Sequence, residues 1–307
     1  MSLLFLSSAR SLNDNHQGTM LLILVGLISA AGWVFTKVAL REISPSVFIA
    51  WRFLLAALVL LVFCWRTLLS FTPSMWRVSC IAGCFMACAL SLWVEGMNQI
   101  ENIGEAAFIV SLVVVCVPII NALLGQSMGW YLWLSLVPAV LGLYCLTGAN
   151  GFALDQAQWL LLGAACLFSC HVVFSARYTQ TIPSLSLTTV QLMMVACVSM
   201  AISVLQGTAL NLFSERISSL GWSMFMCSAL IATSLRFALQ TKALALLPSE
   251  QTSMLSSLTP VFTALLGWAV LGERILPLNL LGCVLIFLAQ PIYFYGRYAS
   301  KGVSKTI

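Results

Sequence analysis

Charged residues are scarce in this chain. Only 7% of its 307 residues are Asp, Glu, Lys or Arg, whereas 61% are hydrophobic. Soluble domains carry about 25% charged residues, and a soluble protein of this length could not cover its surface with so few. The scarcity predicts an integral membrane protein. The net charge of +5 comes from scattered basic residues without a Lys/Arg run, so nucleic acid is not an expected partner.

The sequence also lacks the groups that membrane-embedded enzymes use. It has two histidines, and its two aspartates, Asp14 and Asp155, lie outside the apolar segments. HExxH and an intramembrane Asp pair are absent, and the missing GxxxxGK[ST] motif argues against ATP-driven transport. No repeated filter segment indicates an ion channel. We therefore expect neither enzymatic activity nor a cofactor.

Metal binding is not expected either. The chain has eleven cysteines, nearly all inside apolar runs, and none of them shows CxxC spacing. With only two histidines to accompany them, a zinc site is not indicated. Buried cysteine packs as a small apolar residue, so packing is the predicted role.

Ten apolar segments are long enough to cross a bilayer, which needs about 20 residues. They lie near 19–40, 46–66, 75–96, 103–124, 129–148, 157–177, 185–206, 219–242, 250–271 and 277–297. Lipid cannot satisfy backbone polar groups, so the spans are predicted to be helices. Residues 1–18 do not fit a signal peptide and are predicted to be a short, mobile cytoplasmic tail. Residues 298–307 are predicted to be a cytoplasmic C-terminal tail.

The basic residues predict the orientation. With both termini in the cytoplasm, inside segments hold Arg10, Arg66, Arg77, Arg177, Lys242, Arg297, Lys301 and Lys305, and outside segments hold Arg41, Arg216 and Arg274. This excess favours cytoplasmic termini in the cell (inner) membrane.

The chain repeats itself weakly. The tetrapeptide ALLG stands at 122–125 and again at 264–267, each time beginning four residues after a proline, Pro118 or Pro260. The repeated unit holds five spans, and an odd number makes the two copies enter the membrane in opposite directions. We therefore predict inverted repeats at 19–148 and 157–297, an architecture typical of secondary transporters.

Polar and small residues recur at helical spacing in six segments. These faces comprise Gly26, Ala30, Trp33 and Lys37; Cys80, Cys84, Cys88, Ser91, Glu95 and Asn98; Phe108, Ser111 and Val115; Cys166, Cys170 and Phe174, with His171 beside them; Thr233, Arg236 and Gln240; and Ser249, Ser253, Ser256, Pro260 and Gly267. They are predicted either to line a cavity or, for the small residues, to let helices pack closely.

The charged members admit two interpretations. Arg236 lies within apolar sequence and needs an anionic partner, for which Glu95 or a substrate is a candidate. Glu95 and Lys37 suit either the membrane interface or a cavity. Arg52 is favoured as a structural residue that snorkels outward. His171 suits either a hydrogen-bonded packing role or titration near neutral pH.

Two long stretches resemble one known family. AAGWVFTKVALREISPSVFIAWRFLLAALVLL, residues 30–61, resembles the opening helices of EamA-type transporters of the drug/metabolite transporter (DMT) superfamily, and LQTKALALLPSEQTSMLSSLTPVFTALLGWAVLGERILPLNLLGCVLIFLA, residues 239–289, is similar to the closing block. The resemblance implies ten transmembrane helices in two inverted five-helix repeats, with a cavity lined mainly by helices one, three, four, six, eight and nine.

The resemblance makes ten residues on the polar faces the candidates for the substrate cavity. They are Trp33, Lys37, Glu95, Phe108, Ser111, His171, Arg236, Gln240, Ser253 and Ser256. Pro118 and Pro260 are predicted to be mid-helix hinges. The two halves differ in one place, because LGERI at 271–275 has LGQSMG at 124–129 as its counterpart. The pair Glu273–Arg274 is predicted to be structural.

These patterns favour a secondary transporter of a small organic metabolite, above all an exporter of amino acids or related compounds. Glu95 opposite Lys37 and Arg236 suits a zwitterion, with protons as a candidate coupling ion. The alternatives are a carrier of a choline-like amine, a nucleobase or a sugar, and a channel. The expected partners are the substrate and the lipid bilayer, and no obligatory protein partner is evident.

Overall fold

The protein is all-helical. Its structure is a computed structural model that describes residues 2–101, 103–125, 129–147, 155–178, 182–207, 217–247, 252, 255–256, 258–273 and 277–303, and these residues contain no strand. The first half holds α1 (Ser2–Ala39), α2 (Pro45–Leu69), α3 (Pro73–Gln99), α4 (Ile103–Val110), α5 (Val113–Leu123) and α6 (Trp130–Thr147). The second half holds α7 (Gln156–Tyr178), α8 (Ser184–Leu205), α9 (Ser219–Ala229), the π-helix η2 (Leu230–Leu235), α10 (Arg236–Leu246), α12 (Thr259–Leu266), the π-helix η3 (Gly267–Leu271) and α13 (Pro277–Val303).

Six helices are long and apolar enough to cross a membrane by themselves. They comprise His16–Ala39, Pro45–Leu69, Pro73–Gln99, Gln156–Ser175, Ser184–Leu205 and Ser219–Gln240. Four shorter apolar segments accompany them, namely Val113–Leu123, Trp130–Gly142, Thr259–Leu271 and Leu280–Tyr293. All ten coincide with predicted spans, so a multi-pass membrane protein is confirmed. That the four shorter segments also cross the membrane, which would make ten spans, stays a prediction.

Local sequence signals explain where several helices begin. Pro45 and Pro73 stand in the first turns of α2 and α3, where the missing N–H is not needed. Thr72 caps α3, because its side chain accepts from the N–H of Met75, and Ser218 caps α9 in the same way through Gly221. Such caps satisfy N–H groups that the helix leaves free.

Two predicted boundaries differ from the structure. α1 begins at Ser2 and continues through the predicted tail at 1–18, because no glycine or proline precedes Gly18 to end it. The fourth predicted span, 103–124, is two helices, since the α-helical pattern stops at Ser111 and Leu112. Hydrogen bonds between residues three apart replace the α-helical bonds there: the N–H of Val114 donates to the carbonyl of Ser111, and that of Val115 to the carbonyl of Leu112.

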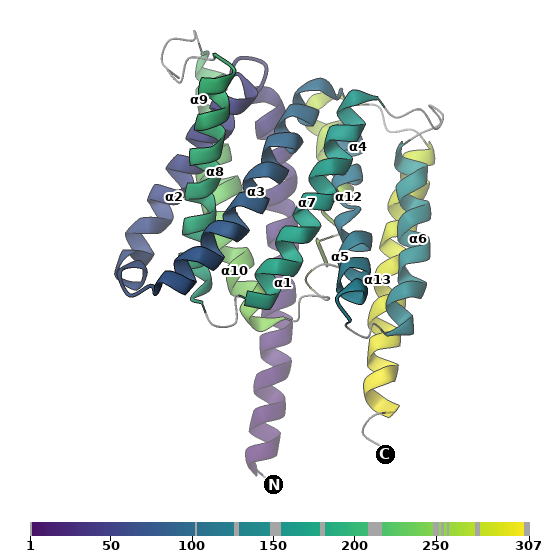
Figure 1. Cartoon of the computed structure of the whole chain (residues 1–307). Helices are drawn as coiled ribbons and strands as arrows, with labels where there is room; N and C mark the ends of the chain where they lie inside the picture. The colour runs from purple at the N-terminus through teal and green to yellow at the C-terminus, as the bar shows by residue number, and fades with distance from the viewer. Residues whose placement is uncertain are drawn as a thin grey trace.

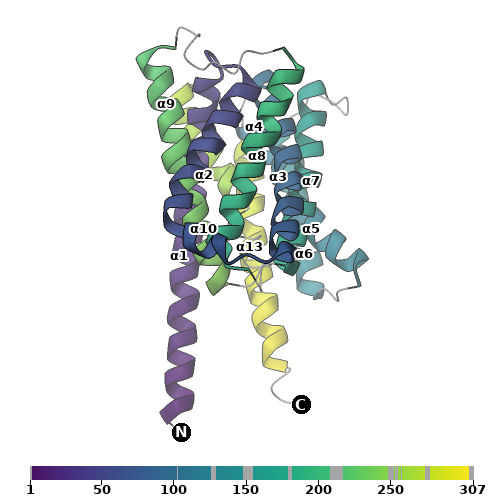
Figure 2. The same ribbon diagram turned by 60° about the vertical axis from the view of Figure 1, so that its left-hand side comes forward.

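Helices of the first half pack mainly against helices of the second half. α2 lies against α8, α3 against α7 and α8, and α6 against α13, while α1 contacts α9, η2, α10 and α12. Figures 1 and 2 show the resulting bundle, with both ends of the chain on the same side. The two halves are therefore interleaved, and a site at their meeting draws residues from both.

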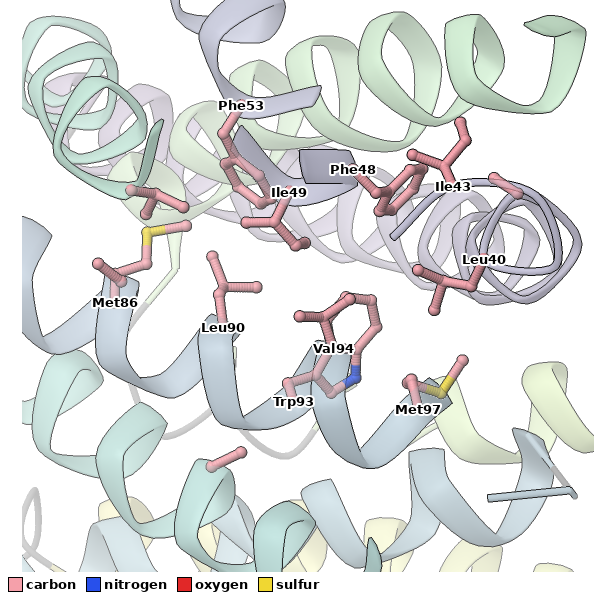
Figure 3. Close-up of a cluster of buried hydrophobic side chains, with 14 of the residues drawn as sticks. Leu40, Ile43, Phe48, Ile49, Phe53, Met86, Leu90, Trp93, Val94 and Met97 are labelled. Carbon is pink, nitrogen blue, oxygen red and sulfur yellow. The ribbon is translucent and has the colours of Figure 1, made fainter. Parts of the chain in front are cut away.

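The largest buried cluster lies beside α2 and α3. Figure 3 shows Phe48, Ile49 and Phe53 of α2 turned toward Leu90 and Val94 of α3. Apolar side chains also cover the outside of the bundle, among them Val62, Phe63, Leu69, Leu123 and Leu205, all strongly exposed. Exposed apolar surface on this scale suits lipid rather than water.

Candidate functional site

Arg52 of α2 is buried inside the bundle. Its side chain is 6% exposed; it donates from Nε to Thr233 Oγ1 of η2 (2.7 Å) and from Nη1 to Thr36 Oγ1 of α1 (2.9 Å). Both threonines are fully buried. The prediction that Arg52 snorkels is therefore wrong, because hydroxyl groups on two neighbouring helices take the place of water as its partners.

The π-helix η2 places Thr233 toward Arg52. Thr233 Oγ1 donates to the carbonyl of Ser228, five residues earlier (2.9 Å), which leaves its lone pairs to accept from the arginine. Single π-turns inside α-helices are frequent at functional sites. A Cβ on Gly32 of α1 would lie 2.7 Å from Ala232 Cβ, so the close approach of α1 to η2 requires glycine at this position.

Arg236 is the first residue of α10 and follows η2 directly. Its Nη2 donates to Gln240 Oε1 (3.0 Å), and its guanidinium carbon lies 4.1 Å from the centroid of the Phe237 ring. Its Nε is buried and has no hydrogen-bond partner among the described residues. The two predicted cavity residues Arg236 and Gln240 are thus brought together in the structure.

The expected pair of Glu95 with Arg236 is not formed. Glu95 accepts from Gln99 Nε2 of its own helix (3.1 Å), because its next helical turn supplies a donor. In the described part of the chain, no carboxylate forms an ion pair with Arg52 or Arg236. Arg52 bonds to Thr233, which lies in the same continuous helical stretch, η2 and α10, as Arg236. The bundle therefore holds two neighbouring cations without a described counter-charge.

Trp33 and Lys37 lie one turn apart on α1 and face α3. The Trp33 ring meets that of Trp93 edge to face, with centroids 5.1 Å apart. Lys37 donates from Nζ to the carbonyls of Met97 (3.1 Å) and Ile100 at the end of α3. A cation is favourable at the negative end of a helix dipole, so Lys37 holds α1 to the end of α3.

Glu273 follows η3 and binds the start of α4. Its Oε1 accepts from the N–H of Ile103 (3.0 Å), so the carboxylate caps a helix of the other half. Burial raises the pKa of Glu273, while hydrogen bonds from Ile103 and Gly104 and the charge of Lys37 lower it. This agrees with the predicted structural role of the Glu273–Arg274 turn; Arg274 lies outside the described residues.

Glu42 makes a similar contact in the connection between α1 and α2. Its Oε2 accepts from the N–H of Ser218 and its Oε1 from Ser218 Oγ, both at 2.7 Å. These two hydrogen bonds hold the pKa of Glu42 below its usual value. The contact joins the end of α1 to the beginning of α9, again across the two halves.

The remaining described polar candidates form no hydrogen bond with one another. His171 of α7 has a buried Nε2 without a hydrogen-bond partner among the described residues. Ser111 donates to the carbonyl of Ala107 (2.7 Å), and Ser256 to that of Thr252 (2.8 Å). Ser253 and the side chain of Phe108 lie outside the described part. Among the described candidates, Arg236 and Gln240 are joined by a hydrogen bond, and a common cavity for the ten residues stays a prediction.

The two prolines predicted to be hinges lie at different positions in their helices. Pro118 is buried inside α5, where it removes one helical hydrogen bond. Pro260 stands in the first turn of α12 rather than at mid-helix. A helix start has no hydrogen bond for proline to break, so the two positions differ in their helical environment.

Among the residues that the structure describes, no group of three or more His, Cys, Asp or Glu side chains could hold a metal ion. The stretch GQSMG at 125–129 has GxSxG spacing but follows the helix α5, not the strand that precedes this nucleophile motif in hydrolases. A hollow beside His16, Gln17 and Met20 lies in the middle part of α1, several turns before Thr36.

The repetition in the sequence corresponds to a known unit. Residues 16–148 and 156–293 each match the model of the EamA-like transporter family. The chain belongs to this family. As an EamA-like protein it is a membrane transporter built from two copies of the family unit, and the resemblance seen in its opening and closing blocks is confirmed.

Two known proteins are similar to this EamA-like chain. The chain is 25% identical over 273 residues to the "Uncharacterized transporter YoaV" of Bacillus subtilis (strain 168), covering 86% of this chain and 92% of that protein. A solved structure described as "Crystal structure of protein" matches with a TM-score of 0.70 at 15% identity, covering 92% of this chain and 98% of the other. The second likeness concerns the fold alone.

We call Arg52, Arg236, Thr36 and Thr233 the arginine cluster of this EamA-like chain. The sequence did not predict the two threonines as partners of Arg52. Thr36 and Thr233 hold Arg52 between two halves, yet neither was expected to bind it. A usable signal exists, because each threonine lies on an apolar helix near a predicted cavity residue, Lys37 or Arg236. Helical spacing shows which residues share a face, but it does not show which helices those faces meet.

Proposed function

We propose that this protein is a secondary carrier that moves a small organic metabolite, above all an amino acid or a related compound, out of the cell by alternating access. The observation that carries the proposal is the pair of neighbouring cations, Arg52 and Arg236, inside a transporter of the EamA-like family. Intramembrane charges usually mark a substrate or ion pathway, and an arginine binds a carboxylate through two parallel hydrogen bonds.

The position of the cluster supports alternating access. Arg52 belongs to the first copy of the family unit, and Thr233 and Arg236 to the second. In carriers with inverted repeats, the substrate site lies where the repeats meet, and the repeats rock about it. The proposal includes inverted copies at 19–148 and 157–297, with both termini in the cytoplasm.

The other candidate residues supply the remaining recognition. Trp33 and Phe108 would accept an apolar side chain, Glu95 the amino group, and Ser111, Ser253 and Ser256 further polar contacts. A proton would couple through Glu95 or His171. These roles extend the proposal beyond the arginine cluster. Each can be tested by substituting the residue and measuring counterflow in proteoliposomes.

A cationic substrate such as a choline-like amine is the main alternative. Its binding near Arg52 and Arg236 would add a third positive charge, and like charges at close range repel strongly in a medium of low dielectric constant. The arginine pair therefore favours an amino acid over this alternative.

Counterflow in proteoliposomes tests the function. Vesicles that contain the full chain and an excess of unlabelled amino acids are assayed for uptake of each labelled amino acid, with and without a proton gradient. We expect saturable uptake of at least one amino acid, and its loss in Arg236→Ala. The exposed Arg66 of α2 provides the matched control, since Arg66→Ala removes a guanidinium far from the cluster's contacts. Uptake of amines or sugars alone, with no amino acid carried, would refute the amino-acid assignment.

A further inference from the structure

Arg52 and Arg236 have unused hydrogen-bond donors. Arg52 uses Nε for Thr233 and Nη1 for Thr36, and makes no hydrogen bond through Nη2 to the described residues. Arg236 uses Nη2 for Gln240, while its buried Nε has no described partner. A guanidinium offers five N–H donors and no acceptor. Both side chains therefore keep donors for an acceptor that the described protein does not supply.

The surrounding residues hold the two guanidinium groups in place. The rings of Phe48 and Phe53 lie 5.6 and 5.5 Å from the guanidinium carbon of Arg52, and Gln240 fixes one end of Arg236. Thr233, which accepts from Arg52, precedes Arg236 by three residues on the same helical stretch. Arg52 thus contacts the continuous helical stretch, η2 and α10, that carries Arg236.

Two cations inside the bundle, Arg52 buried and Arg236 half-buried, are unfavourable without a nearby anion. A cation withdrawn from water carries a large desolvation cost, and like charges repel each other in a medium of low dielectric constant. A carboxylate has two oxygens and about four lone-pair sites, and it can accept from two guanidinium groups at once. An anionic group would thus satisfy the donors and remove the repulsion in one step.

We propose that Arg52 and Arg236 together form a carboxylate subsite, in which the free donors of both guanidinium groups bind the anionic end of the transported molecule. The inference rests on the proposed transport function and narrows it, since a molecule that lacks a carboxylate would not occupy this subsite. Arg52 becomes a binding residue, and Thr36 and Thr233 become residues that position it.

Ligand binding to the purified full-length chain tests the subsite without relying on a variant. Thermal unfolding in nanodiscs is measured against three matched probes for each amino acid that stabilises the protein: the amino acid itself, its amino alcohol, and the acid without its amino group. We expect the amino alcohol to bind at least about tenfold more weakly than the amino acid, because charge-assisted hydrogen bonds are lost. The acid without the amino group should still bind.

Variants then locate the subsite on the chain. Arg236→Gln and Arg52→Gln should remove the preference for the carboxylate over the alcohol, Arg236→Lys should retain part of it, and Arg66→Gln should leave it unchanged. A purely structural arginine would lower the melting temperature of the free protein without altering this preference. If Arg52→Gln does not fold, the Arg236 pair of variants and the wild-type probes still decide the matter.

The outcomes separate the subsite from the transport function. Equal binding of amino acid and amino alcohol, or binding of no carboxylate by the folded protein, overturns the subsite while leaving transport to the counterflow assay. Carboxylate binding that depends on both arginines, combined with no counterflow of any probe, supports the subsite and refutes the carrier.

Discussion

At the scale of the residue, Arg52 shows how a charge is accommodated in a bundle with few polar groups. Its two described acceptors are threonine hydroxyls whose own protons go to backbone carbonyls, those of Gly32 and Ser228. Each hydroxyl thus acts once as donor and once as acceptor. The charge is held by a short chain of hydrogen bonds across three helices rather than by an ion pair.

Removing one hydroxyl tests this arrangement. Thr233→Val keeps the side-chain shape and leaves Arg52 Nε without its acceptor, so we expect the free energy of unfolding to fall by about 1.5–3 kcal/mol. Thermal unfolding in detergent measures the change. Thr67→Val in the last turn of α2 is the matched control, since the described bonds of Thr67 use its main-chain carbonyl. An unchanged melting temperature in Thr233→Val would mean that the bond to Arg52 contributes nothing.

Glu42 gives a pH-dependent contact outside the membrane. Its pKa is depressed by the two hydrogen bonds from Ser218, so the contact is complete above the ordinary glutamate pKa of about 4.3 and is lost as the pH falls through the lower folded value. Hydrogen exchange of the amides at the start of α9, corrected for intrinsic rates, should show this loss of protection. Glu42→Gln should abolish the pH dependence, and Glu101→Gln, a substitution at an exposed site, should retain it.

The sequence predicted which residues share a helix face better than it predicted which residues those faces contact. Arg236 and Gln240 share a face because of their spacing, and the structure confirms that they bond. Arg52 was assigned to the surface because its depth in the span could be estimated, whereas the side of α2 on which its partners lie could not. Glu95 accepts from Gln99 and Arg236 donates to Gln240, each within its own helix; the spacing in the sequence could not show whether their two faces meet.

At the scale of the element, the approach of α1 to η2 decides whether Arg52 can reach both threonines. Gly32→Ala would place a Cβ 2.7 Å from Ala232 Cβ, and neither atom belongs to a flexible side chain. We expect overpacking to lower the stability by about 1–3 kcal/mol, measured by thermal unfolding. The double variant Gly32→Ala with Ala232→Gly restores the space and should recover most of the loss. Failure of this rescue would show that the contact between the two helices is not the cause.

Helix irregularities were harder to predict than helix existence. The apolar runs are long and evenly punctuated, so ten segments could be recognised. The fourth span is divided at Ser111 and Leu112, and η2 is a π-turn. In both places a few hydrogen bonds join residues one position nearer or farther apart than in an α-helix, and composition carries no signal for this. One clue was present, because the first half has more residues between Glu105 and Pro118 than the second half has between Glu250 and Pro260.

At the scale of the whole molecule, the interleaving of the halves predicts mutual dependence. α2 packs against α8, and α6 against α13, so each half alone would leave its contact faces uncovered. We expect a chain divided between α6 and α7 to give two fragments that are degraded when produced separately and form a stable, co-purifying complex when produced together. A fragment that is stable and monodisperse by itself would contradict this expectation. A division inside α8, which breaks a helix, serves as the negative control.

The hydrogen bond between Arg52 and Thr233 joins residues 181 positions apart, and this separation has a consequence for biosynthesis. The ribosome delivers α2 to the bilayer long before η2 exists, so Arg52 must first be inserted without its later acceptor. An arginine at the centre of a nascent span costs about 2.5–3.5 kcal/mol, which several Leu, Ile, Phe and Val residues at roughly −0.3 to −0.6 kcal/mol each can offset. α2 is the most apolar of the six long spans, and it contains no other charge before Arg66. Its many aliphatic side chains can therefore offset the cost of inserting Arg52 before the second half is made.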